Sequence, residues 1–298
     1  MTNTALQSLV AAELAVPVDP RISAMAAAIA DRYPDAARGV LFYGSCLRTA
    51  DLDGQMLDFY LIVSDYRAAY PARWMATANH MLPPNVFPFT YRGLAAKYAI
   101  LSEQDLAQLC RPAASTVSVW ARFAQPARLI WTADAGAADR IVAAIAQAVP
   151  TLFALTLPTM VDRPDDDPVP VWRAAFALTY RAELRAERDD RSESIVDADP
   201  ARYERFGSAA LAGLTVPVEA NRATALRRWR RLQRNGKWLT AARLIKASAT
   251  FAGGIDYLAW KINRHAGAQI VIRPWQRRFP VIGALTLLPR LIRGGAVR

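Results

Sequence analysis

Two short apolar runs, joined by a glycine turn and a polar stretch, organise the first third of the chain. Residues 40–43 (VLFY) end abruptly at Gly44-Ser45, and Asp58 then opens a second run at residues 59–63 (FYLIV). Short apolar runs bounded by turn residues are typical of buried strands. The pattern predicts a strand, a tight turn that enters a short helix, and a neighbouring strand that begins with a carboxylate.

Helical and strand-like patterns alternate through the rest of the first half. Apolar residues at helical spacing predict helices, and apolar runs bounded by proline or polar residues predict strands. The expected helices cover residues 21–33, 70–81, 102–110, 118–126 and 135–153, and the expected further strands cover 86–91, 95–101 and 128–131. A helix over 21–33 would pack beside the first strand, and this half reads as an α+β domain.

The second half lacks strand patterns and divides into two parts. Residues 161–170 are rich in proline and aspartate and form the clearest linker, and helices are expected over 171–188 and 203–214. The three consecutive aspartates in this linker are interpreted as a solvated loop. We therefore expect a first domain at 1–160, a mostly helical second domain at 161–221, and a basic C-terminal region at 222–298.

The charge is distributed very unevenly. The chain of 298 residues carries a net charge of +11, yet residues 222–298 alone hold seventeen Lys or Arg and one acid, Asp256, which gives +16. The other 221 residues hold 20 basic and 25 acidic side chains, which gives −5. Such a region implies a polyanionic partner, either nucleic acid or an anionic membrane surface.

The composition of the basic region favours the membrane. Basic residues surround Trp229 and Trp238 and recur at 273–278 (RPWQRR), and an apolar run follows at 279–289. Eleven residues are too few to cross a bilayer, which takes about twenty, but a basic and apolar amphipathic tail suits its interface. An apolar tail adds nothing to phosphate-backbone binding, so nucleic acid is the less favoured partner.

The cysteine content and the N-terminal sequence indicate the cellular compartment that we expect. Two cysteines, Cys46 and Cys110, lie far apart, which argues against a disulfide framework and for a reducing compartment. The first fourteen residues lack the basic start of a signal peptide. We expect a peripheral membrane protein in a reducing compartment.

The glycine turn and the aspartate suit phosphate chemistry. Gly44 permits close backbone approach, and Ser45 offers a hydroxyl and amides at a helix N-terminus, where anions are favoured. Asp58 is placed to hold a divalent cation against the same phosphates.

This stretch resembles the motif of the polymerase-β-like nucleotidyltransferases, in which Gly-Ser precedes an acidic strand. The resemblance implies their fold, an α+β domain with a mixed sheet flanked by helices. The pattern YGSxxx…MxDFxxxV is most similar to the mitochondrial-type phosphatidate cytidylyltransferases, the translocator assembly and maintenance family, and their bacterial relatives. The superfamily motif has a second carboxylate two residues after the first, where this chain has Tyr60.

The resemblance assigns further residues to the site. It implies that Tyr43, Gly44 and Ser45 seat the nucleotide, and that Lys97 discharges the leaving pyrophosphate. Asn79 and His80, followed later by Lys97-Tyr98, match the family in kind, and the resemblance implies a nucleotide-binding role for Asn79. His80 alone reads more readily as a structural surface residue. Arg122 is expected either to reach the nucleotide or to form a salt bridge.

A second carboxylate is implied from the other half of the chain. The family motif Ser-Tyr-x-Gly-Asp-x-Arg, followed by Ile-Val, resembles residues 179–185 (TYRAELR) and 195–196 here. Glu183 would then be the missing metal ligand beside Asp58, and Arg185 would bind the nucleotide. A plain exposed helix face is the alternative reading.

With the basic tail, the resemblance implies an enzyme of phospholipid biosynthesis, in the route to cardiolipin, that lies peripherally on the cytoplasmic face of a bacterial inner membrane. It would transfer CMP from CTP to phosphatidate with Mg²⁺, releasing pyrophosphate and forming CDP-diacylglycerol. Two alternatives stay open: nucleotide transfer to RNA or a small molecule, and a non-catalytic membrane-associated protein on a decayed nucleotidyltransferase scaffold. Tyr60 is the residue that argues for the second.

Overall fold

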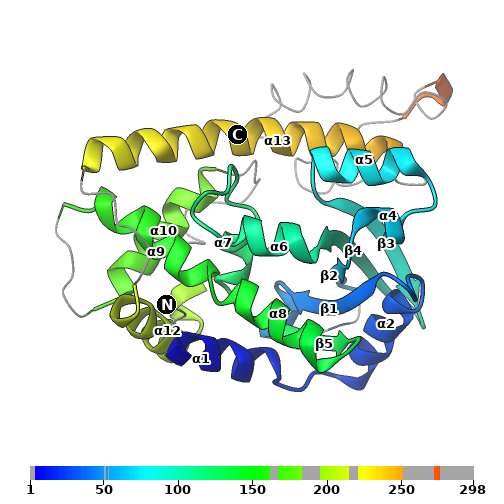
Figure 1. Ribbon diagram of the computed structural model, residues 1–298, viewed down its shortest axis with the longest axis horizontal. Helices are drawn as coiled ribbons and strands as arrows, with labels where there is room; N and C mark the ends of the chain where they lie inside the picture. The colour runs from blue at the N-terminus through cyan, green and yellow to red at the C-terminus, as the bar shows by residue number, and fades with distance from the viewer. Residues whose placement is uncertain are drawn as a thin grey trace.

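The computed structural model describes residues 4–49, 52, 54–161, 167–182, 195–214, 221–250 and 272–275. Within these ranges the chain forms an open sheet with helices on both faces, and helices alone follow it (Figure 1). The α+β prediction, with a mixed sheet flanked by helices and then a helical part, is confirmed.

The sheet has five strands in the order β3-β4-β2-β1-β5. The strands are β1 (Ala37–Tyr43), β2 (Met56–Val63), β3 (Asn85–Tyr91), β4 (Leu94–Ser102) and β5 (Ala127–Thr132). β2 and β4 are parallel, and the other three neighbouring pairs are antiparallel. The sheet is therefore mixed, with its parallel pair in the middle.

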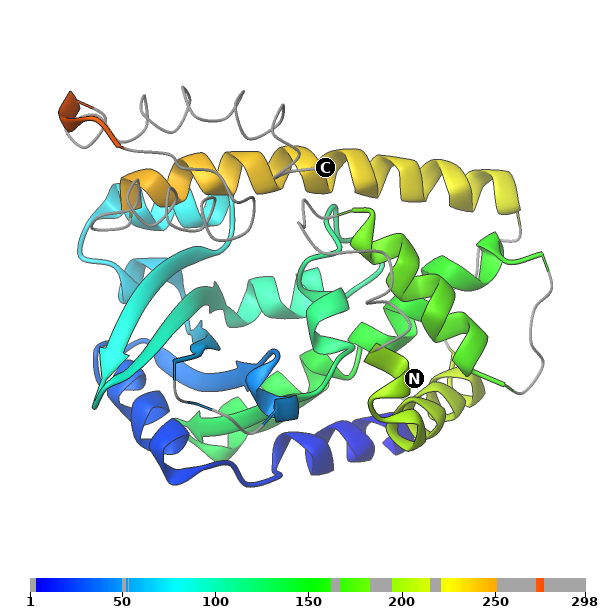
Figure 2. The same cartoon turned by 180° about the vertical axis from the view of Figure 1, so that it is seen from behind.

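The helices connect and cover these strands (Figures 1 and 2). They are α1 (Thr4–Leu14), α2 (Pro20–Ala30), α3 (Cys46–Thr49), α4 (Tyr66–Ala69), α5 (Arg73–Met81), α6 (Glu103–Leu109), α7 (Trp120–Phe123), α8 (Ala135–Ile145), α9 (Ala148–Thr156), a short 3₁₀ turn (Leu157–Thr159), α10 (Val169–Tyr180), α12 (Pro200–Ala212) and α13 (Arg222–Thr250).

Alternation along the strands sends side chains to two separate cores. Phe42, Phe59 and Tyr98 point to one face, where residues of α2, α4 and α5 cover them. Tyr43 and Tyr60 point to the other face, into a larger cluster with α6, α7, α8 and α9. The two-residue period of the strands thus separates the two layers.

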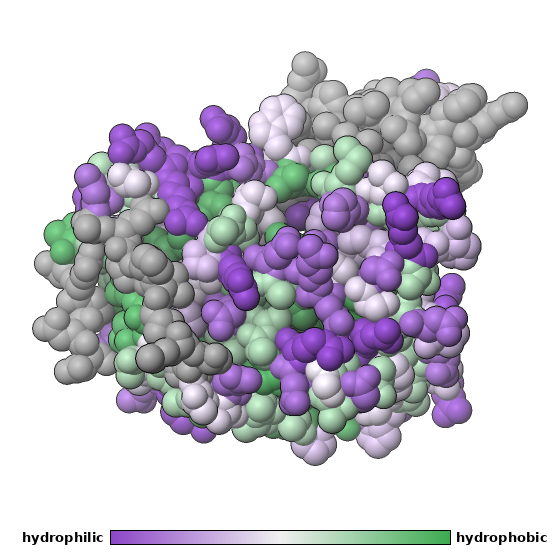
Figure 3. Space-filling model, in the orientation of Figure 1, coloured by the Kyte–Doolittle hydropathy of each residue, from purple (hydrophilic) through white to green (hydrophobic). Residues whose placement is uncertain are grey.

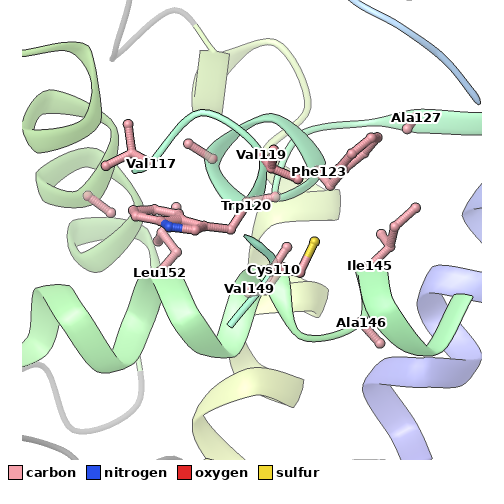
Figure 4. Packing of buried hydrophobic residues seen from close by; sticks show 14 of the residues in the cluster. Cys110, Val117, Val119, Trp120, Phe123, Ala127, Ile145, Ala146, Val149 and Leu152 are labelled. Carbon is pink, nitrogen blue, oxygen red and sulfur yellow. The ribbon is translucent and has the colours of Figure 1, made fainter. Parts of the chain in front are cut away.

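The larger cluster extends without a break into the helical half of the chain. Figure 4 shows its centre, where Trp120 lies over Leu152 and Phe123 points toward Ala127. Trp172 of α10 continues the cluster through an edge-on contact with Phe153, with ring centroids 5.0 Å apart. One core therefore draws residues from all three segments that the sequence distinguishes.

Helix α13 is held to this core by Trp229. Its side chain is 2% exposed, packs edge-on against Trp120 with centroids 6.0 Å apart, and donates from Nε1 to the carbonyl of Leu155 at 2.7 Å. Trp238, about two and a half turns further along, is 73% exposed. Trp229 is a core residue, so of the two tryptophans only Trp238 is available to a membrane surface.

Three helices differ from their expected lengths. The expected helix 135–153 is two helices, because the chain turns between Ile145 and Ala148, and the expected helix 118–126 is the single turn α7. The described part of the expected helix 171–188 ends with Tyr180 in α10. In the described residues one stretch, Ala135–Thr159, has the length and hydropathy of a membrane span, and 83% of its most apolar window is buried in the protein.

Candidate active site

The glycine turn after β1 touches the carboxylate of β2. Tyr43 ends β1 directly opposite Asp58, and Gly44 follows with φ of +100°, a region that favours glycine. A Cβ atom on Gly44 would lie 3.0 Å from Oδ2 of Asp58. The backbone can approach the carboxylate this closely only because residue 44 has no side chain.

Lys97 lies on the opposite side of the same carboxylate. It faces Asp58 in the parallel β2–β4 register, and its Nζ lies 3.1 Å from Oδ1. The two side chains are 33% and 22% exposed. This contact is an ion pair without hydrogen-bond geometry, and Oδ1 is buried with no hydrogen bond from the described residues. Asp58 is therefore neutralised but keeps acceptor capacity.

An aromatic cluster occupies the position of the second carboxylate. Tyr60 points to the same face as Asp58, and its ring lies 5.2 Å from that of Tyr43 and 5.3 Å from that of Phe123. The guanidinium of Arg122 lies over the Tyr43 ring, 4.9 Å from its centroid. The predicted residues Tyr43 and Arg122 thus lie together at the edge of the site, with Arg122 on an aromatic face.

Asp58 is the predicted acid that the structure places at this site. The described residues contain no group of three His, Cys, Asp or Glu side chains able to hold a metal ion. Glu183 and Arg185 lie outside the described residues. Their neighbour Ala182 is buried, and a Cβ on Gly236 of α13 would lie only 2.1 Å from its carbonyl oxygen.

Asn79 lies elsewhere, within the opposite layer of the fold. It is 0% exposed, and its amide donates to the carbonyl of Ile100 at 3.0 Å and to the Tyr70 hydroxyl at 3.3 Å. These bonds fasten α5 to β4 on the face of the sheet that Asp58 does not share. The structure therefore places Asn79 in a packing role and does not bring it to the predicted nucleotide site. His80 is exposed on α5, as its surface reading predicts.

A second polar pocket, absent from the sequence predictions, lies at the other end of the parallel strands. It has a volume of about 320 Å³ and includes Ser64, His80 and Ser102 in its lining. The sequence carries a signal for it, because both parallel strands run into a Ser-acid pair, Ser64-Asp65 and Ser102-Glu103. That signal becomes informative only once β2 and β4 are known to be parallel neighbours.

Comparisons with known proteins add little to this geometry. No protein-family model and no curated protein matches the sequence. A solved structure of a nucleotidyltransferase-like protein from Exiguobacterium sibiricum is similar over 93% of this chain and 91% of that chain, at 15% identity and a TM-score of 0.27. A likeness this distant leaves the functional argument to the site itself.

Proposed function

We propose that this chain is a nucleotidyltransferase, and that its reaction is the transfer of CMP from CTP to phosphatidate. The observation that carries the proposal is the contact of three groups: the Gly44 turn, the Asp58 carboxylate and the Lys97 ammonium. A left-handed glycine turn, a helix N-terminus and a cation around one acid are the parts that bind and orient a polyphosphate.

Each of these residues has a distinct task in the proposed reaction. A phosphate oxygen of the lipid attacks the α-phosphorus of CTP, and the bond from that phosphorus to the β-phosphate oxygen breaks, so pyrophosphate leaves. Gly44 and Ser45 would seat the β and γ phosphates through backbone amides and the serine hydroxyl. Lys97 would neutralise the charge that develops on the leaving pyrophosphate.

The donor set at Asp58 fits Mg²⁺ held partly by its substrate. Mg²⁺ is commonly bound by one or two carboxylates together with substrate phosphates and water, and Oδ1 of Asp58 is a buried acceptor with no hydrogen bond from the described residues. When bound, the ion would supply positive charge between the two phosphate anions. Glu183 is the proposed second ligand.

Helix α13 supports the choice of an anionic lipid as acceptor. Its exposed side chains include Arg227, Arg231 and Arg234, which recur at helical spacing and lead to the exposed Trp238. Figure 3 shows hydrophilic residues gathered at the upper left, over the first half of this helix. The helix sequence contains no Asp or Glu. Cations beside an exposed tryptophan favour the surface of an anionic bilayer.

One observation favours the non-catalytic alternative. Tyr60 is packed among aromatic rings where the motif has its second carboxylate, and the described residues form no group of three metal-ligating side chains around Asp58. A decayed site of this kind would bind nucleotide without turning it over. Nucleotide binding and turnover must therefore be measured separately.

The deciding experiment supplies the purified chain with phosphatidate in mixed micelles, Mg²⁺ and each nucleoside triphosphate in turn. We expect lipid-linked cytidylate with CTP, and its loss in Asp58→Asn. Product with another acceptor or another nucleoside triphosphate would change the proposed substrates but support the proposed reaction, nucleotidyl transfer. CTP binding without product in the presence of phosphatidate would support the decayed scaffold. The proposal would be wrong if the native chain neither bound a nucleotide nor formed product, and Asp58→Asn behaved in the same way.

A further inference from the structure

The parallel strands β2 and β4 end at a topological switch point. After β2 the chain passes to α4 and α5, which pack on one face of the sheet, whereas after β4 it passes to α6, which packs on the other face. When connections leave neighbouring strands toward opposite faces, a crevice opens outside their carboxyl ends, and α/β proteins bind ligands in such crevices. The pocket of about 320 Å³ lies at this point.

The walls of this pocket come from all three segments that meet there. After β2 come Ser64 to Arg67, α5 supplies Thr77 and His80, and Ser102 ends β4 shortly before Gln104. The lining therefore combines hydroxyls and a carboxamide with a guanidinium, an imidazole and the carboxylate of Asp65. All of these groups except the carboxylate can donate hydrogen bonds, which suits a ligand rich in acceptor oxygens.

The charges around the pocket leave the cations available. Of the acids, Asp65 accepts the amides of Arg67 and Ala68 at 2.7 and 2.9 Å, and Asp105 accepts the Tyr66 hydroxyl. Glu103 is paired with Arg140 at 3.0 Å. In contrast, the described residues give the side chains of Arg67 and His80 no acidic partner within 4.0 Å. The carboxylates keep their negative charge, but each is already engaged by an amide, a hydroxyl or an arginine. Among the lining residues, the Arg67 guanidinium is therefore the cation available to an added anion.

The pocket is separate from the Asp58 site. Asp58 lies six residues before Ser64 along β2, and a strand rises about 3.3 Å per residue, so the two sites are about 20 Å apart. A ligand here does not contact the Gly44 turn or Lys97.

We propose that this pocket is a second binding site for a small oxyanion of the phosphate-monoester type. Arg67 offers the planar, two-pronged donor that suits a phosphate, and the Ser64 hydroxyl and the Gln104 carboxamide supplement it. His80 adds a ring N–H donor. The volume lies at the small end of the range for ligand pockets and suits a small phosphorylated molecule or free phosphate.

Imidazole NMR of the full chain tests the site directly. The sequence has two histidines, His80 and His265, and a His80→Gln variant assigns their signals. We expect sulfate, inorganic phosphate and methyl phosphate each to shift the His80 signal saturably at pH 6, with midpoints of about 1 mM or below. Equal response to phosphate and methyl phosphate identifies the phosphate group as the feature recognised. A response to phosphate alone assigns the site to the free ion.

Variants then separate this site from general surface charge. Arg67→Gln should raise the midpoint at least about tenfold, the effect of one charge-assisted hydrogen bond. The matched control Arg73→Gln removes an exposed arginine of α5 outside the pocket and should leave it unchanged. Thr77→Val serves as a second, milder pocket variant. The sulfate affinity measured by calorimetry should follow the same order in the three variants.

Two results would overturn the site: a shift of the His80 signal that chloride reproduces at equal ionic strength, or the same midpoint in Arg67→Gln and Arg73→Gln. The proposed transferase activity has no part in these measurements, so either proposal can fail alone.

Discussion

Asp58 and Lys97 face each other across the parallel pair β2–β4, with Oδ1 and Nζ 3.1 Å apart. The pairing means that the acid is neutralised before any ligand arrives, and that a bound cation or phosphate must share or replace the ammonium. The site is therefore built to exchange one charge partner for another.

Replacing Lys97 by Met should lower kcat about 100-fold with little change in the stability of the fold. The lysine is partly exposed, so its neutralising role matters more in the reaction, where charge develops on the leaving pyrophosphate, than in the folded ground state. Steady-state kinetics with CTP and phosphatidate measures the effect. Arg140→Gln, which breaks a partly exposed ion pair elsewhere, is the matched control and should leave kcat unchanged.

Gly44→Ala should weaken nucleotide binding, and by more than the backbone strain at residue 44 alone would cause. The new Cβ would meet Asp58 at 3.0 Å, and residue 44 would also keep a φ of +100°. Gly93→Ala is the control, because Gly93 has a φ of +83° but open space around its Cβ position. Both variants should lose about 1–3 kcal/mol of unfolding free energy. We expect weaker nucleotide binding, measured by calorimetry, in Gly44→Ala alone, and equal binding in both would contradict a phosphate-seating turn.

The buried ion pair of Arg202 and Glu13 should dominate the attachment of α12 to α1. The two bonds are 2.5 and 2.9 Å long, and Arg202 is 3% exposed. Burial alone would lower the pKa of Arg202, but its hydrogen bonds to Glu13 and the charge of Glu13 raise it overall.

Removing the Glu13 charge in Glu13→Gln should cost about 3–5 kcal/mol in urea unfolding, because the buried guanidinium loses its counter-ion. The exposed pair Arg173–Asp197 offers the comparison, and Arg173→Gln should cost about 0–1 kcal/mol. Similar losses in the two variants would show that the buried pair contributes no more than a surface contact.

Lys246 should make the protein more stable as the pH rises above 7. Burial, and then the charge of Arg243, lowers the pKa of Lys246 to about 7, whereas a lysine in an unfolded chain titrates near about 10.4. Between these values the unfolded chain binds more protons, so the free energy of unfolding increases with pH. A neutral amine still has two N–H groups for the carbonyls of Leu82 and Pro84 that Nζ contacts.

Urea unfolding between pH 7 and 9 measures this rise, which we expect to reach about 1–3 kcal/mol after allowance for partial exposure. Lys246→Met should flatten it. The range stops below pH 10 because burial raises the pKa of several tyrosines, whose ionisation in the unfolded chain would lower stability there. They are Tyr33, Tyr66, Tyr70 and Tyr98.

The exposed face of α13 should govern binding to anionic vesicles. In the triple variant Arg231→Gln, Arg234→Gln, Trp238→Ala, we expect at least about tenfold weaker binding, since each cation near such a surface contributes about 1 kcal/mol. Vesicle sedimentation at low and high salt measures it. Removing residues 273–298, which lie outside the described residues except for 273–275, is expected to weaken binding as well. Unchanged binding in both would exclude this end of the chain as the membrane contact.

Local patterns predicted the strands and the turn well, because short-range features determine them. The run before Gly44, the carboxylate that starts the apolar run at Asp58 and the Ser102 cap are all visible within a few residues. The pairing of β2 with β4 is not visible in this way. It joins residues 39 positions apart, Asp58 and Lys97, and only long-range packing specifies it.

The roles of the two tryptophans in α13 show why local composition misleads. Trp229 and Trp238 both have basic neighbours, yet one is buried and the other exposed. Helical phase distinguishes them, because Ala225, Trp229, Leu232 and Gly236 recur at the spacing of one helix face, and all four are buried. Asn79 shows the same limit of local sequence patterns. Its side chain is of a type that binds ligands, but in the structure it donates a hydrogen bond to the carbonyl of Ile100 inside the core.

The burial of Trp229 has a consequence for how the molecule is assembled. In a chain truncated before residue 222, the Trp120 indole would be exposed to water and the Leu155 carbonyl would lose its hydrogen-bond donor, Trp229. The truncation should therefore destabilise the helical half of the protein as well as remove α13. Ribosomal synthesis must therefore reach α13 before that half can close. Any force that detaches α13 also breaks the contacts of Trp229 within the core.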